Sequence, residues 1–143
     1  MMNTIFLDID GVLYGMATDD LFHAMADPKI LDMICKFHLE NNCHVVITST
    51  RRMFKYERDE IDKVFADFDY SYLNYKERLI SRDKEIEKHV TEAGLTNYVI
   101  IDDNDLGYSE NEMLSKHFVQ VDQMIGLTEN DLIKAKSILN NEF

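Results

Sequence analysis

The sequence predicts an α/β fold with a central, mostly parallel sheet covered by helices on both faces, which makes three layers. Its strand segments, such as 3–9 and 98–101, are nearly unbroken apolar runs, as in strands buried on both faces. Segments with helical periodicity alternate with these runs. Polar residues such as Asp8, Thr48 and Asp102 follow the strands, at the sheet edge where ligands of such folds bind.

The first strand is expected over residues 3–9. The next helix opens at Asp27 and Pro28, because Asp is a favoured cap and Pro is favoured in the first helical turn. Apolar residues recur at helical spacing through this helix, which ends near 41–42. β-Branched residues then predict a second strand over 44–48.

A second helix is expected over roughly 53–66, followed by a short strand near 69–73. Ser81 suits the cap of a third helix, and Gly94 is a natural terminator for it. This order continues the alternation of strands and helices.

A continuous apolar strand over 98–101 ends in the pair Asp102-Asp103, and the last strand is expected over 116–121. Thr128 caps a final helix. The residues expected on its buried face are Leu132, Ile133, Ala135 and Leu139.

The composition predicts one globular domain over residues 1–143, because 143 residues that are 45% hydrophobic can bury a core. Cys35 and Cys43 form no redox or metal motif, so we expect reduced thiols in a cytoplasmic protein. The first residues include no basic region and Asp8 interrupts the apolar run, so no signal peptide is expected. No segment is long enough to cross a membrane, so no membrane partner is expected.

The charge is unevenly distributed along the chain. The net charge of −12 argues against non-specific binding of nucleic acid. Residues 51–88 hold ten of the 15 Lys and Arg residues together with ten acids, so this segment is neutral and the flanking segments are acidic. An anionic ligand is therefore expected at residues 51–88, unless this segment is only a solvated, mixed-charge surface.

Two acids end the first strand one residue apart. Residues of a strand alternate between its faces, so Asp8 and Asp10 are expected to point the same way. Two like charges ~4 Å apart repel by several kcal/mol at an effective dielectric constant of about 20. A cation between them, or a proton on one, would relieve this repulsion. A calcium loop of the EF-hand type is disfavoured, since Gly11 comes too early.

The segments 8–12, 45–51 and 100–103 resemble motifs one, two and four of the haloacid dehalogenase (HAD) superfamily. The pattern is similar to the phosphatase domains of Swiss-Army-Knife RNA repair proteins and, more distantly, of polynucleotide kinase-phosphatases. The closing segments 118–122 and 126–128 also fit that group. The resemblance implies a Rossmann-like, HAD-like sandwich.

The resemblance also implies a Mg²⁺ site and covalent catalysis. The carboxylate of Asp8, the backbone carbonyl of Asp10 and Asp102 would hold the metal, with Asp103 close behind; Mg²⁺ prefers such oxygen ligands. Asp8 would attack phosphorus to form an aspartyl-phosphate. Asp10 would protonate the leaving oxygen and then activate water.

Motif two of the resemblance supplies phosphate-binding groups. The hydroxyl of Thr48 and the amides after it, beginning at Ser49, would hold the phosphoryl oxygens near a helix amino terminus. Arg51 lies where the helix dipole disfavours cations, which makes sense if an anion binds there.

The third motif of the superfamily is a lysine, for which Arg82 and Lys84 are both candidates. Arg82 shares the helix face of Ile86 and Val90, which is expected to face the sheet. Lys84 is rotated by about 200° from Ile86 and is expected to point outward. The periodicity therefore favours Arg82.

The connections after motifs one and two are short, so we expect a minimal cap or none and an open site. The expected activity is Mg²⁺-dependent hydrolysis of phosphomonoesters, with the terminal phosphate of a polynucleotide or nucleotide as substrate. The alternatives are a phosphatase for nucleotides or sugar phosphates and a non-catalytic HAD-fold binding module.

Overall fold

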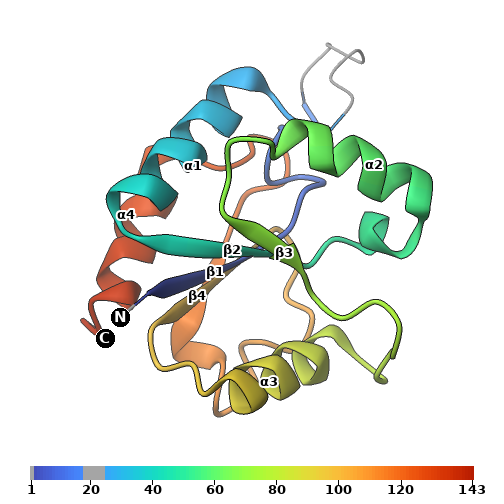
Figure 1. Ribbon diagram of the computed structural model, residues 1–143. Coiled ribbons are helices and arrows are strands. Elements are labelled where there is room, and N and C mark those ends of the chain that lie inside the picture. Colours follow the sequence, from blue (N-terminus) through green and yellow to red (C-terminus); the bar gives the residue numbers. More distant parts are fainter. Residues whose placement is uncertain (1, 18–24) are drawn as a thin grey trace.

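The computed structural model describes residues 2–17 and 25–143. Its centre is a five-stranded sheet in the order β3-β2-β1-β4-β5, and each pair of neighbouring strands is parallel (Figure 1). The strands are β1 (Asn3–Leu7), β2 (Cys43–Ile47), β3 (Tyr70–Tyr72), β4 (Tyr98–Asp102) and β5 (Phe118–Gln120). The sheet and the α/β class predicted from the sequence are confirmed.

Helices cover both faces of this sheet, as Figure 1 shows. The α-helices are α1 (Pro28–Glu40), α2 (Lys55–Val64), α3 (Arg82–Ala93) and α4 (Glu129–Leu139), and the 3₁₀ helices are η1 (Thr50–Met53) and η2 (Ser115–His117). Helices α1, α2 and α4 pack on one face, and α3 packs on the other. The molecule therefore has the three expected layers.

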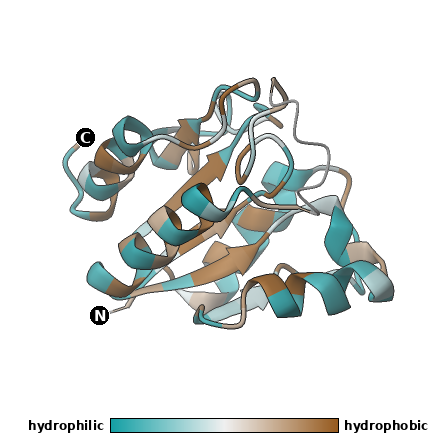
Figure 2. Cartoon of the chain, turned by 90° about the horizontal axis from the view of Figure 1, so that it is seen from above, coloured by the Kyte–Doolittle hydropathy of each residue, from teal (hydrophilic) through white to brown (hydrophobic). Residues whose placement is uncertain are grey.

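Alternate strand residues supply the two cores. Ile5 and Leu7 of β1 pack in the core that includes α1, α2 and α4, whereas Phe6 packs with Ile86 and Val90 of α3. Both faces of the central strands are mostly apolar, and most of the strand ribbon in Figure 2 is accordingly brown.

The helix ends follow local chemistry. The side chain of Asp27 accepts a hydrogen bond of 2.8 Å from the backbone N–H of Lys29 and so caps α1. Gly94 ends α3 with a φ of +64°. Thr128 and Asp131 form a reciprocal capping box at the start of α4.

Beyond shifts of one or two residues at strand ends, three expectations differ from the structure. The helix expected over 53–66 is divided by Phe54, whose extended backbone separates η1 from α2. The strand expected over 116–121 is η2 followed by the shorter β5. Ile133, expected to be buried, is 66% exposed. Helix α4 buries the line of Leu132 and Leu139, and Ile133 lies about 100° off it.

The segment between motifs two and three adds no cap domain in the described residues. It forms η1, α2 and β3, which belong to the sheet and its covering layer. The connection after motif one, residues 14–27, is only long enough for a short flap, and its residues 18–24 lie outside the described residues. None of the described helices has the length and apolar character needed to cross a membrane.

Candidate active site

Three acids meet at the carboxyl edge of the sheet. Strands β1 and β4 pair with Leu7 opposite Ile101, so Asp8 and Asp102 follow side by side. The backbone N–H of Asp8 donates to the carbonyl of Ile101 at 3.1 Å and continues this pairing. Asp8, Asp102 and Asp103 each place a carboxylate oxygen within 4.8 Å of the others. The parallel topology thus joins residues that lie nearly 100 positions apart.

The electrostatics of this three-acid cluster suit a hard cation. Asp102 and Asp103 are 1% and 8% exposed. Burial, and then the negative charge of Asp102, raise the pKa of Asp8, and burial also raises the pKa of Asp102. Three carboxylates this close together, two of them buried and Asp8 half-buried, repel one another unless a cation or protons offset their charge. Their oxygen atoms are the donors that Mg²⁺ prefers, so the residues present fit this ion.

The loop after β4 holds the Asp102-Asp103 pair in place. The backbone N–H of Asn104 donates to Oδ1 of Asp102 at 2.9 Å, and the hydroxyl of the buried Tyr108 lies 3.5 Å from its Oδ2. The side-chain amide of Gln120 donates to the carbonyl of Asp103 at 3.2 Å. Both acids are therefore oriented by groups behind them.

Gly11 allows Asp103 to approach the first loop. Its φ is +75°, a conformation that other residues rarely adopt. A Cβ atom at this position would lie 2.4 Å from Oδ2 of Asp103. A glycine is therefore required both for the turn after β1 and for the space that Asp103 fills.

Asp10 lies in a different environment from Asp8. Its carboxylate accepts hydrogen bonds from Arg51, with Nη2 at 2.7 Å and Nε at 3.0 Å, and from the hydroxyl of Tyr14 at 2.7 Å. Burial alone would raise its pKa, but these bonds outweigh burial and lower the pKa of Asp10. The environments shift the pKa values of the two acids in opposite directions, as acid–base pairs in active sites require.

Arg51 therefore binds an acid of the protein itself in this structure. In addition to Asp10, its Nη1 lies 3.5 Å from Oε2 of Glu57 on α2. Sequence reasoning expected Arg51 beside a phosphate, and it missed Tyr14 and Glu57. These contacts join residues up to 41 positions apart, and no sequence motif predicts them.

Thr48 and Ser49 lie between β2 and η1, next to the acids. The backbone N–H of Thr48 donates to the carbonyl of Leu7 at 2.9 Å, so this segment follows β1 at the sheet edge. Both residues are 1% exposed. Oγ of Ser49 accepts from the N–H of Arg51 at 3.2 Å and caps η1. Thr50, the next residue, reaches the cavity beside the acids.

The structure separates the two candidates for motif three. Arg82, the first residue of α3, has a side chain 10% exposed and lines the same cavity as the acids. Lys84 is 58% exposed, pairs with Glu87 at 3.3 Å and lines a separate cavity. Arg82 is thus brought to the site and Lys84 is not, as their helix positions indicated.

These groups surround an open cavity of about 310 Å³. Its lining consists of Asp8, Asp10, Met16, Thr50, Arg82, Asp102, Asp103, Asn104, Leu106 and Gln123. Met16, Leu106 and Gln123 come from loops in which no sequence pattern distinguished them. The cavity thus brings together four carboxylates, the guanidinium of Arg82 and the hydroxyl-bearing Thr50.

Comparison with known proteins agrees with this geometry. The chain matches, over residues 4–132, the family described as the HAD domain in Swiss Army Knife RNA repair proteins. Neither the curated proteins nor the solved structures contain a match. The family match supports a phosphatase of the HAD type in general. Since it spans most of the sequence, the chain belongs to the family of HAD domains found in Swiss Army Knife RNA repair proteins.

Proposed function

We propose that this protein is a Mg²⁺-dependent phosphomonoester hydrolase in which Asp8 is the nucleophile. The observation that carries the proposal is the three-acid cluster, with Arg82 lining the same cavity. Asp8 lies within it at the end of the central strand β1, where a rigid backbone positions its carboxylate.

Four groups would hold the ion: the carboxylates of Asp8 and Asp102, the backbone carbonyl of Asp10, and Asp103 beside them. When bound, Mg²⁺ would offset the charge of the acids and of the incoming phosphate. The remaining chemistry belongs to side chains of the protein.

The reaction follows from the contrast between Asp8 and Asp10. A carboxylate oxygen of Asp8 attacks phosphorus, and the bond from phosphorus to the leaving oxygen breaks. Asp10 gives its proton to that oxygen. Asp10 then takes a proton from water, which attacks the aspartyl-phosphate, releases inorganic phosphate and regenerates Asp8. The hydrogen bonds from Arg51 and Tyr14 favour the ionised form of Asp10, which is the form that accepts a proton from water in the second step. In the first step Asp10 must be protonated, so the bound substrate has to weaken these two hydrogen bonds.

The phosphoryl oxygens would be held by the hydroxyl of Thr48, by the amides of the following residues and by Arg82. Arg51 is a further candidate for binding the phosphate, because an incoming phosphate would compete with Asp10 for the guanidinium of Arg51. Arginine suits both roles, since its planar fork binds carboxylate and phosphate alike.

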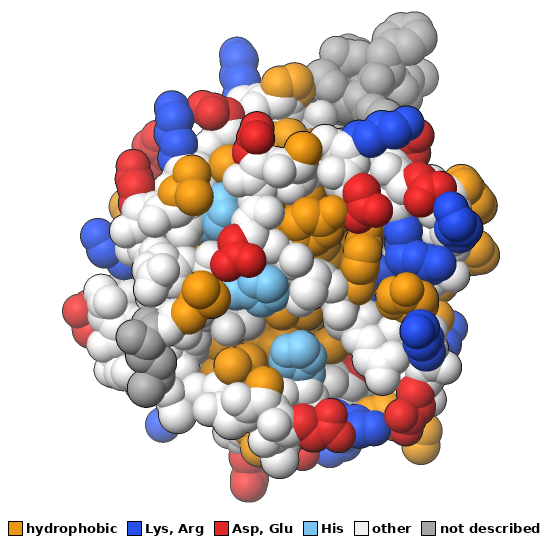
Figure 3. All heavy atoms as spheres, in the orientation of Figure 1, with side chains coloured by type: hydrophobic (Ala, Val, Ile, Leu, Met, Phe, Trp, Pro, Cys, Tyr) orange, Lys and Arg blue, Asp and Glu red, His pale blue; other side chains and the backbone are white. Residues whose placement is uncertain are grey.

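The favoured substrate is the terminal phosphate of a polynucleotide or nucleotide, in the cytoplasm. The family supports an RNA-related substrate. The open cavity supports a large one, because only a terminal phosphate needs to enter it. Basic and acidic side chains are intermixed on the face shown in Figure 3, which supports recognition of an end rather than of a long duplex. Both cysteines are free thiols, in keeping with a reducing compartment.

The test is phosphate release from an aryl phosphate with and without Mg²⁺, by the native chain and by Asp8→Asn. We expect Mg²⁺-dependent release by the native chain and a loss of at least about 10³-fold in the variant. Equal release by both would overturn the proposal. Oligonucleotides with 3′- or 5′-phosphates, compared with mononucleotides and sugar phosphates, then identify the substrate class.

A further inference from the structure

We propose that Arg52 is a positioning residue that orients the phosphate-binding segment 48–50 from behind. The inference rests on the proposed function and goes beyond it, because Arg52 does not line the site cavity. Its side chain is fully buried, with 0% exposure. Arginine is rarely buried to this extent without a specific set of partners.

The guanidinium of Arg52 satisfies four acceptors. Its Nη1 donates to the carbonyls of Thr48 at 2.6 Å and Ser49 at 3.1 Å. Its Nε donates to the carbonyl of Leu73 at 3.1 Å, and its Nη2 to Oε2 of Glu85 at 3.2 Å. Three of the four acceptors are backbone carbonyls, and two of these belong to the phosphate-binding segment. The side chain thus fixes backbone orientation at this position.

Fixing these carbonyls also orients the amides that follow them. No peptide bond in the described residues is cis, and in a trans peptide the C=O and the next N–H point in opposite directions. Because Arg52 binds the carbonyls of Thr48 and Ser49, the N–H groups of Ser49 and Thr50 point away from it. Within the described part of the chain, neither N–H has an acceptor. Thr50 lines the site cavity, so unpaired donors are available where a phosphoryl oxygen would bind.

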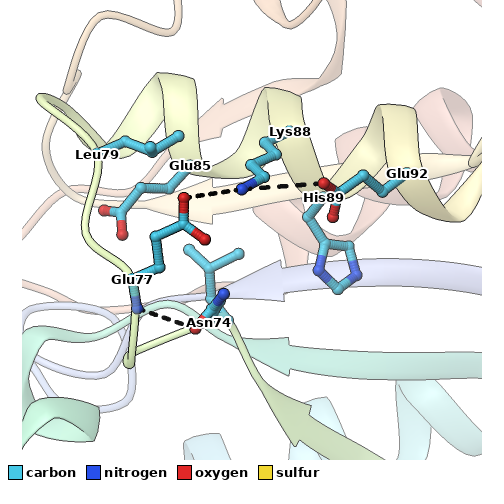
Figure 4. Close-up of a pocket in the computed structure, with 8 residues that line it drawn as sticks. Asn74, Glu77, Leu79, Glu85, Lys88, His89 and Glu92 are labelled. Carbon is cyan, nitrogen blue, oxygen red and sulfur yellow. Dashed lines mark hydrogen bonds and ion pairs between the residues drawn. The ribbon is translucent and has the colours of Figure 1, made fainter.

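Glu85 supplies the countercharge for this arrangement. It lies 8% exposed on α3, and its Oε1 is 3.6 Å from Nε of Arg82 in the site. Lys88, one turn further on, contacts Glu77 at 3.1 Å and Glu92 at 3.9 Å instead, as Figure 4 shows. Glu85 therefore remains available to the two arginines. Burial and the charge of Arg82 lower the pKa of Arg52 to about 10, so Arg52 remains protonated at neutral pH.

A buried ion pair can instead serve the fold alone, and the variants must separate the two roles. Arg52→Met leaves the buried Glu85 with only its longer contact to Arg82, which is destabilising. The double variant Arg52→Met/Glu85→Leu removes both charges and is expected to fold, because apolar residues of similar volume often replace such pairs without loss of stability. Glu85→Gln also removes the charge that faces Arg82 but keeps Arg52 and an acceptor for it, so it measures how much of the effect comes from the loss of that charge. Urea unfolding establishes that each variant is folded.

The readouts are the dissociation constants of Mg²⁺ alone and of inorganic phosphate in the presence of Mg²⁺, both by calorimetry. We expect the double variant to bind phosphate at least about tenfold more weakly while its Mg²⁺ affinity changes less than threefold, because the three acids are held independently of Arg52. Glu85→Gln keeps Arg52 and should bind phosphate at least about threefold more tightly than the double variant.

Phosphate binding by the double variant at native strength would overturn the inference, as would equal weakening of Mg²⁺ and phosphate binding. If the native chain itself binds neither ligand, the proposed function fails instead. The two failures are therefore distinguishable.

Discussion

Substitution of Gly11 by alanine tests how closely the first loop and Asp103 depend on each other. An added Cβ would lie 2.4 Å from Oδ2 and 2.9 Å from Cγ of Asp103. Ordinary contact begins at 3.4 Å, so the carboxylate must move by about 1 Å, which can cost about 10²-fold in activity. Gly11 also has a φ of +75°, where a residue with a Cβ loses about 1–2 kcal/mol.

Gly94 provides a matched control for the free-energy cost of placing a residue with a Cβ at a positive φ. Its φ is +64°, and nothing lies within 4 Å of a Cβ added there. Gly94→Ala should therefore lower the free energy of unfolding by about 1–2 kcal/mol and leave Mg²⁺ affinity and phosphatase activity near native. Gly11→Ala should lose more stability than this, because its Cβ also overlaps Asp103, and should show weaker Mg²⁺ binding and a fall of about 10²-fold in activity.

The assay combines urea unfolding, calorimetric titration with Mg²⁺ and hydrolysis of an aryl phosphate. If the two alanine variants showed the same Mg²⁺ affinity and activity, the close approach of Asp103 to the loop would have no functional role. The space left by Gly11 would then not be what positions Asp103 in the three-acid cluster.

Three further predictions concern the charges of the site. Arg82→Met should lower kcat/KM by about 10²-fold or more, whereas Lys84→Met should change it by less than about threefold; similar losses in both would contradict the assignment of motif three. Burial raises the pKa of Asp102 from 3.8 to about 7. Between these two pH values the metal-free folded state binds more protons than the unfolded state, so its stability falls as pH rises. Without metal, Asp102→Asn should therefore be more stable than the native chain by about 1–3 kcal/mol at pH 8 and by less at pH 5. A difference in the free energy of unfolding that is the same at both pH values, measured by urea unfolding, would contradict this. Tyr14→Phe removes one hydrogen bond to Asp10, so the pH–rate profile should shift to higher pH with a loss of under about tenfold in kcat.

The fold was largely predictable because its signals are local. The apolar run over β1, the Asp27-Pro28 helix start and Gly94 each depend on residues close in sequence. The break at Phe54 was not predictable, because the helical pattern continues through it. Ile133 lies about 100° from the line of Leu132 and Leu139, so helical periodicity places it at the margin of the buried face, and the packing of α4 leaves it exposed.

The site was predictable where strand topology controls it. Asp8 and Asp102 had to meet, because β1 and β4 are parallel neighbours in register. The contacts of Arg51 with Asp10 and of Arg52 with Glu85 were not predictable, since they join residues 41 and 33 positions apart. The acceptors of Arg52 are mostly backbone carbonyls, which every residue carries and no motif can mark.

The most direct test of the central claim is the position of a divalent ion in crystals soaked with Mn²⁺, located by its anomalous scattering. We predict one strong peak in contact with the carboxylates of Asp8 and Asp102, and its loss in Asp102→Asn. A peak confined to the separate acidic cavity at Asp83 and Glu87, or no peak beside Asp8, would contradict the account.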